Sequence, residues 1–143
     1  MIFIKTFGRF AISIDNYVLP FKNLKVKELL AFLVDNEGDF VGNEKIISAL
    51  WPQRDHDISA KRTCRYTLRL LRETLSKAGF SDLIEVSYGV VKIDKEKVVC
   101  DYYEYIKGNT EQYPYDDEYM YGYSWAEPTR KRIAERQVKI NHG

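Results

Sequence analysis

Cysteine and histidine are scarce in this 143-residue chain, which contains two of each. Cys64 and Cys100 lie far apart and form no CxxC pair, and His56 and His142 add no spacing typical of metal ligands. These absences favour a reduced, metal-free protein of the cytoplasm with no bound cofactor.

Long apolar runs are also missing, and none could cross a bilayer, so no membrane association is expected. The N-terminus alternates apolar and basic residues and so lacks a secretory pattern. No Ser-His-Asp set, phosphate-binding glycine loop or glycosidase-like carboxylate pair stands out, which predicts a non-enzyme. The polar residues 55–57 and 116–118 lack the further ligands that a metal site needs.

Charge is present in quantity but is unevenly distributed, although the formal net charge is only +1. Residues 58–79 carry six Lys/Arg against one Glu, whereas residues 101–128 carry seven Asp/Glu against one Lys. Residues 129–143 are basic again. A uniformly solvated surface would mix the two signs, so the separation indicates surfaces of different character.

The order of the expected elements is strands, then three helices, then a hairpin, which indicates an α+β fold. Gly8 and Arg9 separate two β-rich alternating segments, which predicts an antiparallel hairpin. A second turn at Asn16 and Tyr17 leads to a short third strand, and Pro20 places that strand at a sheet edge. The expected strands are residues 2–7, 10–15 and 17–21, and those of the later hairpin are residues 83–86 and 90–93, with Gly89 at the turn.

Three helices follow from the spacing of apolar residues. Asn23 can cap the first helix and Asn43 the second, while Gly79 stands where a left-handed residue would end the third. Pro52 stops the second helix, and Asp57 can cap the third. The helices are expected from residue 24 toward residue 38, over residues 43–51 and over about residues 58–78.

The sequence changes character near residue 101, so we expect a domain over residues 1–100 and an extension over residues 101–143. Eight of the eleven tyrosines lie between residues 102 and 125, together with Trp125. These side chains either pack on the domain as an extra layer, which is favoured, or form a surface for self-association or a partner. Helical segments are expected at residues 101–108 and 126–140.

The rotation of the third helix decides where its arginines point. At about 100° per residue, Leu68, Leu71 and Leu75 fall within about 40° of Cys64, and this stripe should face the core. The opposite face then carries cations with no acid to pair at the next turn until Glu73. The residues expected on that face are Arg62, Arg65, Tyr66 and Arg69, flanked by Lys61 and Arg72.

A solvated helix face is the ordinary explanation of a charge run. Two features favour binding to double-stranded DNA instead: the face has a single sign, and arginine predominates, whose planar fork fits guanine edges and phosphates. A basic helix that follows a helix and a polar loop is a helix-turn-helix arrangement, and the major groove admits such a helix. The hairpin that follows is then either a plain sheet edge or a wing whose lysines reach phosphates: Lys92, Lys95 and Lys97.

At this point the pattern resembles the OmpR/PhoB-type winged helix-turn-helix domain, and most closely the variant found in SARP-type transcriptional activators and some response regulators. The sequence "ALWP" at residues 49–52 is similar to the end of the family's second helix, and residues 61–75 are similar to its basic third helix. The resemblance covers about residues 2–106. Residues 113–136 look like the opening of the helical bacterial transcriptional activation domain that follows in that family.

The resemblance implies a bacterial transcriptional regulator, including the form in which a two-component response regulator carries this effector domain. It implies that the third helix reads bases through Arg62, Arg65, Tyr66 and Arg69. Backbone contacts would come from Lys61, Arg72, Lys92 and Lys95. The loop that can touch RNA polymerase corresponds to Gln53, Arg54, Asp55 and His56, and such domains bind repeated half-sites as homodimers.

Two departures from the family pattern matter. The family's wing carries Gly-Gly-Tyr before its last strand, whereas residues 88–91 here read Tyr-Gly-Val-Val. The activation-domain-like segment stops early, which fits either a shortened natural form or a fragment without an upstream receiver domain. The rival function is a protein-interaction module whose basic helix docks on an acidic partner or on the chain's own acidic segment.

Overall fold

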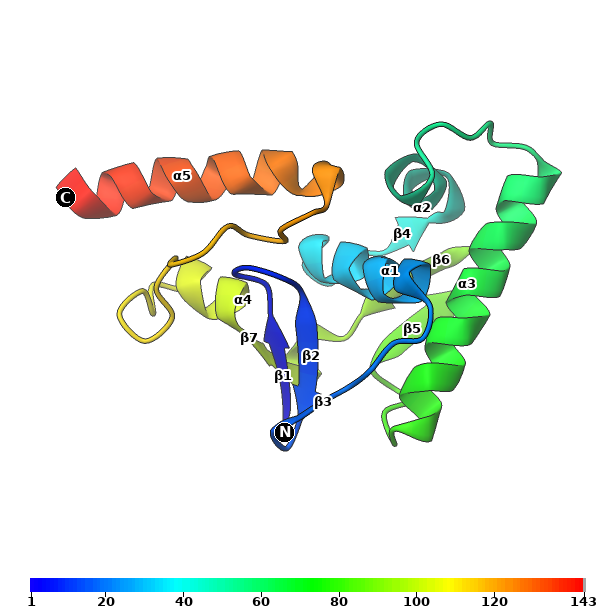
Figure 1. The fold of residues 1–143 in the computed structure, drawn as a ribbon, viewed down its shortest axis with the longest axis horizontal. Helices are drawn as coiled ribbons and strands as arrows, with labels where there is room; N and C mark the ends of the chain where they lie inside the picture. Colours follow the sequence, from blue (N-terminus) through cyan, green and yellow to red (C-terminus); the bar gives the residue numbers. More distant parts are fainter. Residues whose placement is uncertain (143) are drawn as a thin grey trace. The chain divides into compact units, whose positions relative to one another are not determined.

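The computed structural model describes residues 1–142 and has an α+β architecture with two small sheets and several helices (Figure 1). The α+β class expected from the sequence is therefore confirmed. The chain forms two compact units, Met1–Leu19 with Val98–Gly143 (unit 1) and Pro20–Lys97 (unit 2). The predicted domain boundary at residue 100 lies within unit 1 and stays a prediction.

Within residues 1–142, none of the helices has the length and apolar content needed to cross a membrane.

Unit 1 contains a four-stranded sheet in the order β3-β2-β1-β7. The predicted hairpin of β1 and β2 is confirmed, and so is the edge position of β3. The turn before β3 is made by Asp15 and Asn16, one residue earlier than predicted, because both tolerate the positive φ that they adopt here. The strands are β1 (Ile2–Lys5), β2 (Ala11–Ile14), β3 (Tyr17–Val18) and β7 (Val98–Cys100), the last parallel to β1.

The extension is part of unit 1. It contains helices α4 (Asp101–Ile106) and α5 (Glu127–His142), with a 3₁₀ turn η2 (Ser124–Ala126) between them. The backbone of Gly8 donates to the Glu118 carbonyl at 2.8 Å, and that of Met120 donates to the Thr6 carbonyl at 2.7 Å. Four tyrosines of the extension are buried, so packing, the favoured interpretation, is confirmed for them: Tyr102, Tyr103, Tyr105 and Tyr119.

One arginine anchors α5 to the segment before it. Arg130 donates from Nε to the Tyr119 carbonyl at 2.8 Å and from one terminal nitrogen to the carbonyls of Met120 and Tyr123 at 2.8 and 2.7 Å. These carbonyls lie in an irregular segment, where those of Met120 and Tyr123 also accept a backbone N–H within a turn. The hydrogen bonds from Arg130 are charge-assisted, which is the stronger kind. The start of α5 is therefore fixed by a side chain as well as by buried apolar contact.

A buried carboxylate joins the two ends of the chain that make up unit 1. Asp101 accepts backbone N–H groups from Thr6 at 2.8 Å, Phe7 at 3.0 Å and Tyr102 at 2.8 Å, and the Thr6 hydroxyl at 2.6 Å. A buried charge is tolerated only when its oxygens are fully hydrogen-bonded, and here they are. Asp101 thus holds the end of β1 to the start of α4.

Replacement of Asp101 by Asn should lower the free energy of unfolding by about 2–3 kcal/mol, because the amide NH₂ would face N–H donors that lose their acceptor. Urea denaturation followed by circular dichroism measures the change. Asp116→Asn is the matched control, since Asp116 is exposed in the same unit. Equal losses in the two variants would contradict the role given to Asp101.

Unit 2 places three helices against a three-stranded sheet in the order β4-β6-β5, with α1 in contact with α2, α3 and β6. The predicted cap of α1 is confirmed, because the Asn23 side chain accepts from the backbone of Lys25 and Val26. The helices are α1 (Leu24–Asp35), α2 (Asn43–Leu50) and α3 (Ile58–Lys77). The strands are β4 (Val41–Gly42), β5 (Ile84–Ser87) and β6 (Val90–Ile93), followed by a 3₁₀ turn η1 (Lys95–Lys97).

The predicted cap of the second helix is wrong by one residue. Gly42 is the N-cap of α2, and Asn43 is the first helical residue. Gly42 keeps an extended backbone because it also ends β4, so the change to helical geometry comes one position later. The Asn43 side chain is then free to accept a weak hydrogen bond from the thiol of Cys64 at 3.7 Å.

Candidate nucleic-acid interface

Helix α3 begins and ends at the residues expected from the sequence. The Asp57 side chain accepts the backbone N–H of Ala60 at 2.8 Å, which confirms its capping role. Gly79 follows the helix with φ of 90°, a conformation that costs glycine little. The buried side chains of α3 recur every three or four residues: Ala60, Cys64, Thr67, Leu71 and Leu75.

The predicted stripe is correct at three positions and wrong at one. Thr67 is buried, whereas Leu68 is only half-buried. Thr67 tolerates burial because its hydroxyl donates to the Thr63 carbonyl at 2.8 Å, so no polar group is left unsatisfied. Leu68 therefore lies at the edge of the core-facing side of α3.

The cationic side of α3 has little internal neutralisation. Glu73 is the acid that pairs with this side of the helix: its Oε1 lies 3.9 Å from Arg69 Nε, and both side chains are more than half exposed. The Arg69 guanidinium also lies 5.1 Å from the centre of the Tyr66 ring. An exposed pair at this distance contributes little, so the positive charge remains available to a ligand. All six predicted residues of this helix are exposed: Lys61, Arg62, Arg65, Tyr66, Arg69 and Arg72.

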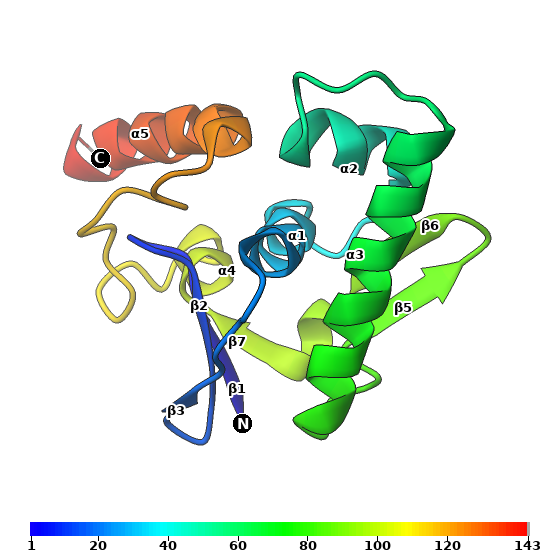
Figure 2. The same ribbon diagram turned by 45° about the vertical axis from the view of Figure 1, so that its right-hand side comes forward.

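A hollow lies between α3 and the β5–β6 hairpin, which run beside each other in Figure 2. Its cations come from α3 and its apolar floor comes mostly from the hairpin, an arrangement that suits a chain of anions with apolar rings or sugars. A second hollow shares Arg69 and Arg72 and continues to Glu73, Ser76 and Ser81. The first hollow is lined by Asn43, Arg65, Leu68, Arg69, Arg72, Val86, Gly89, Val90 and Val91.

The lysines of the hairpin region do not line either hollow. Lys92 lies on β6 with its ammonium 4.8 Å from the centre of the Phe40 ring, a cation–π contact. Lys95 follows β6 in η1, at the end of the hairpin opposite its turn. Lys97 binds Asp82, and this hydrogen bond lowers the pKa of the Asp82 carboxyl. The structure thus separates the predicted lysines from the arginine cluster.

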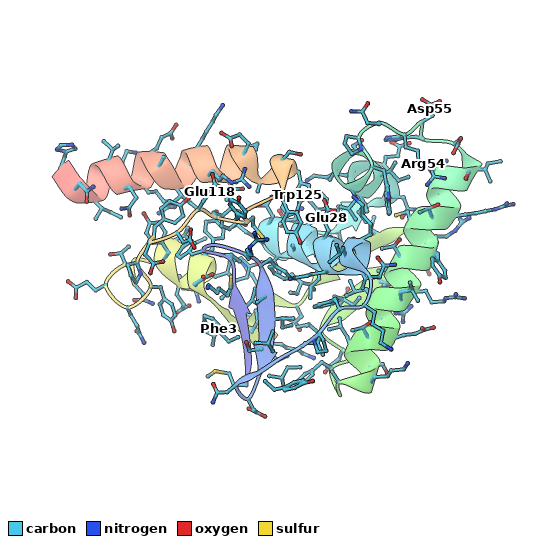
Figure 3. The ribbon with its side chains drawn as sticks, viewed as in Figure 1. Phe3, Glu28, Arg54, Asp55, Glu118 and Trp125 are labelled. Carbon is cyan, nitrogen blue, oxygen red and sulfur yellow. The ribbon has the colours of Figure 1, made fainter. Side chains whose placement is uncertain are left out.

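The loop between α2 and α3 uses two of its four predicted residues internally. Arg54 donates to the hydroxyls of Thr63 at 2.9 Å and Ser59 at 2.7 Å, and so is turned toward α3 (Figure 3). His56 Nε2 lies 3.2 Å from the Ser48 hydroxyl. Gln53 and Asp55 are exposed. Among residues 1–142, no group of three His, Cys, Asp or Glu side chains is placed to hold a metal ion.

Sequence reasoning missed the apolar side of the hollow. Val86 and Val90 come from the hairpin, and Asn43 comes from the start of α2. The alternation of β5 and β6 could have shown that Val86 and Val91 share a face, since they are cross-strand partners. No signal in the sequence shows that this face meets the arginines of α3, because that contact depends on tertiary packing.

No family model and no curated protein sequence matches this chain. Among solved structures, the chain is similar in fold to Mycobacterium tuberculosis EmbR, which was solved in complex with a low-affinity phosphopeptide. The TM-score is 0.72 at 19% sequence identity, and the likeness covers 96% of this chain. The matched part is 42% of the EmbR chain, so this chain spans less than half the length of that protein.

The Cys64 thiol gives α3 a pH-dependent stability. Burial raises the pKa of Cys64 above its ordinary value, with a smaller opposing effect of Arg65. The unfolded chain releases this proton at a lower pH than the folded chain does, so the contribution of Cys64 is complete below pH about 8.5 and is lost as the pH rises toward the folded pKa.

Wild-type protein should therefore lose stability between pH 7.5 and 9.5, and Cys64→Ser should lose less, because serine does not titrate there. Urea unfolding at the two pH values measures both slopes. Burial also raises the pKa of Cys100, but that contribution is the same in both proteins, so the difference between the two slopes reports on Cys64. Identical slopes would show that Cys64 has the same pKa in the folded and unfolded states.

Proposed function

We propose that this chain binds double-stranded DNA in a sequence-specific manner as the effector domain of a bacterial transcriptional regulator. The observation that carries the proposal is the predominantly cationic exposed face of α3, with Arg65, Arg69 and Arg72 gathered at one hollow. Arginine forms paired hydrogen bonds with guanine edges and with phosphates. An enzyme would need convergent catalytic groups, and this face offers cations and apolar carbons.

The fold supports the same function. Helix α2, the polar loop and α3 follow one another as in a helix-turn-helix, with the basic side of α3 exposed. EmbR, which was solved with a bound phosphopeptide, shares this fold. In this proposal α3 enters the major groove, and the β5–β6 hairpin acts as the wing beside it.

Contacts divide into those that read sequence and those that supply affinity. On α3, Arg62, Arg65, Tyr66 and Arg69 face the bases, while Lys61 and Arg72 face phosphates. In the hairpin region, Lys92 and Lys95 add phosphate contacts. Neither lysine lines the hollow, so the phosphates that they contact lie farther from α3 than those that Arg72 contacts. Phosphate contacts would make the affinity fall steeply as salt is raised.

The regulatory setting is part of the proposal. Gln53, Asp55 and His56 are exposed in the loop through which RNA polymerase would be contacted. Arg54 is held by hydrogen bonds to α3, and His56 lies within hydrogen-bond distance of the Ser48 hydroxyl. We place the protein in the cytoplasm as a homodimer on repeated half-sites. A two-component response regulator is one arrangement in which such an effector domain works.

A mobility-shift titration at two salt concentrations separates DNA binding from the rival protein-interaction function. DNA binding predicts shifts with genomic fragments at low salt that weaken as salt rises. Selection of bound duplexes from a random pool then gives the sequence preference and the spacing of half-sites. Absence of any shift at low salt would reject the DNA function and leave an acidic protein partner as the ligand of α3.

Arg65→Ala should weaken binding to the selected duplex by about 1–3 kcal/mol and relax the preference at one base pair, if the side chain makes a paired base contact. Lys77→Ala is the control, because Lys77 is exposed on the same helix but lines neither hollow. Fluorescence anisotropy against duplexes with single base changes measures both effects. Uniform weakening across all duplexes would instead identify Arg65 as a phosphate contact.

A further inference from the structure

The turn of the β5–β6 hairpin contains an aromatic residue in an unfavourable place. Ser87 pairs with Val90, so the turn consists of Tyr88 and Gly89 alone, with φ of 42° and 80°. Positive φ at both positions is the type I′ geometry, which favours Asn or Asp before Gly. A bulky side chain is rarely found in this region of backbone space, because its Cβ crowds the backbone.

The chain itself offers a comparison, because a second two-residue turn joins β2 to β3. Asp15 and Asn16 adopt φ of 50° and 70° there, and both residue types tolerate this conformation. Both residues of the β2–β3 turn are thus suited to its backbone, whereas Tyr88 is not suited to its position in the β5–β6 turn. Local turn stability does not explain the presence of Tyr88.

Packing within the chain does not explain it either. The Tyr88 side chain is fully exposed, and no hydrogen bond or ring contact involves it among the described residues. Other bulky residues with positive φ differ in this respect: Met120 is buried and its backbone donates to Thr6. An exposed ring on a strained backbone, with no partner in its own chain, indicates a contact outside the chain.

The surroundings of the turn point to the kind of partner. Gly89 and Val90 line the hollow that Arg65, Arg69 and Arg72 share, so Tyr88 stands at the edge of the cationic hollow. Resting on the proposed function, we infer that the Tyr88 ring inserts against a base step of the bound duplex, in the minor groove next to the major groove that α3 occupies. The tip of a two-residue turn is narrow, and apolar or aromatic side chains partly unstack base steps in this groove.

This contact reads deformability and not hydrogen-bond patterns. Pyrimidine–purine steps unstack most easily, so they should be preferred at the position that Tyr88 meets. The ring carries the interaction, and the hydroxyl is not required. No phosphate contact is involved, so the number of ions released on binding should not depend on Tyr88.

The decisive variant is Tyr88→Asn, because it restores the preferred Asn-Gly turn. Because Asn tolerates the positive φ of this position, the variant should raise the thermal midpoint of unfolding by about a few degrees. The same variant should weaken binding to the selected duplex by about tenfold, with an unchanged salt slope and a lost preference at one flexible step. Tyr88→Phe should bind as the wild type does. Tyr17→Asn, which removes an exposed tyrosine of unit 1, is the matched control and should bind normally.

A duplex carrying 2-aminopurine at successive positions tests the unstacking directly. Its fluorescence should rise at one step with the wild type and Tyr88→Phe, and should not rise with Tyr88→Asn. Unchanged affinity of Tyr88→Asn, equal losses in Tyr88→Asn and Tyr88→Phe, or a lowered thermal midpoint of Tyr88→Asn would each overturn the inference. If the wild type binds no duplex, the proposed function fails as well; if it binds and Tyr88→Asn matches it, this inference alone fails.

Discussion

The burial of one side of α3 is the constraint on which the candidate interface depends. Cys64, Leu71 and Leu75 are fully buried, and they fix the rotation of a 20-residue helix about its axis. Once that rotation is fixed, the arginines have no inward position available, and the capped start of the helix at Asp57 fixes where they lie along the axis. The positive surface is thus a consequence of packing, since the side chains that create it contribute little to holding α3 in place.

Both units have a core of buried apolar side chains. Unit 1 adds side-chain hydrogen bonds to the backbone: the Asp101 carboxylate accepts the N–H groups that follow β1, and the Arg130 guanidinium donates to carbonyls before α5. Such fully satisfied networks specify one arrangement, because any shift would leave a buried group without a partner.

Much of unit 2 could be predicted from the sequence, because its signals are local. Asn23, Asp57 and Gly79 mark helix ends through their own backbone preferences, and alternation identifies the β5–β6 hairpin. Errors occurred where a second contact competes with the local rule. Thr67 reads as polar but is buried through a hydrogen bond to its own helix, and Gly42 caps α2 because it also belongs to β4. The parallel pairing of β7 with β1 could not be predicted, since three residues carry too little pattern to identify a distant partner.

The candidate site was predictable in part, because the positions of its arginines also follow from a local signal. Helical periodicity alone places Arg62, Arg65 and Arg69 on the exposed side of α3, and all three are exposed. It cannot show that Val86 and Val90 complete a hollow with those arginines, nor that Arg54 is held by Ser59 and Thr63. These features depend on distances between elements that are separate in the sequence.

The way unit 1 is assembled has a consequence for biosynthesis. Thr6 meets its partner Asp101 only 95 positions later, whereas unit 2 is one uninterrupted stretch of chain, Pro20–Lys97. On the ribosome, β1 and β2 emerge before unit 2 but lack β7 and the Asp101 carboxylate, and unit 2 has all of its own elements before either appears. Of the two units, translation therefore makes the arginine-bearing unit the first that can fold, and β1 and β2 complete their sheet only after unit 2 has been synthesised.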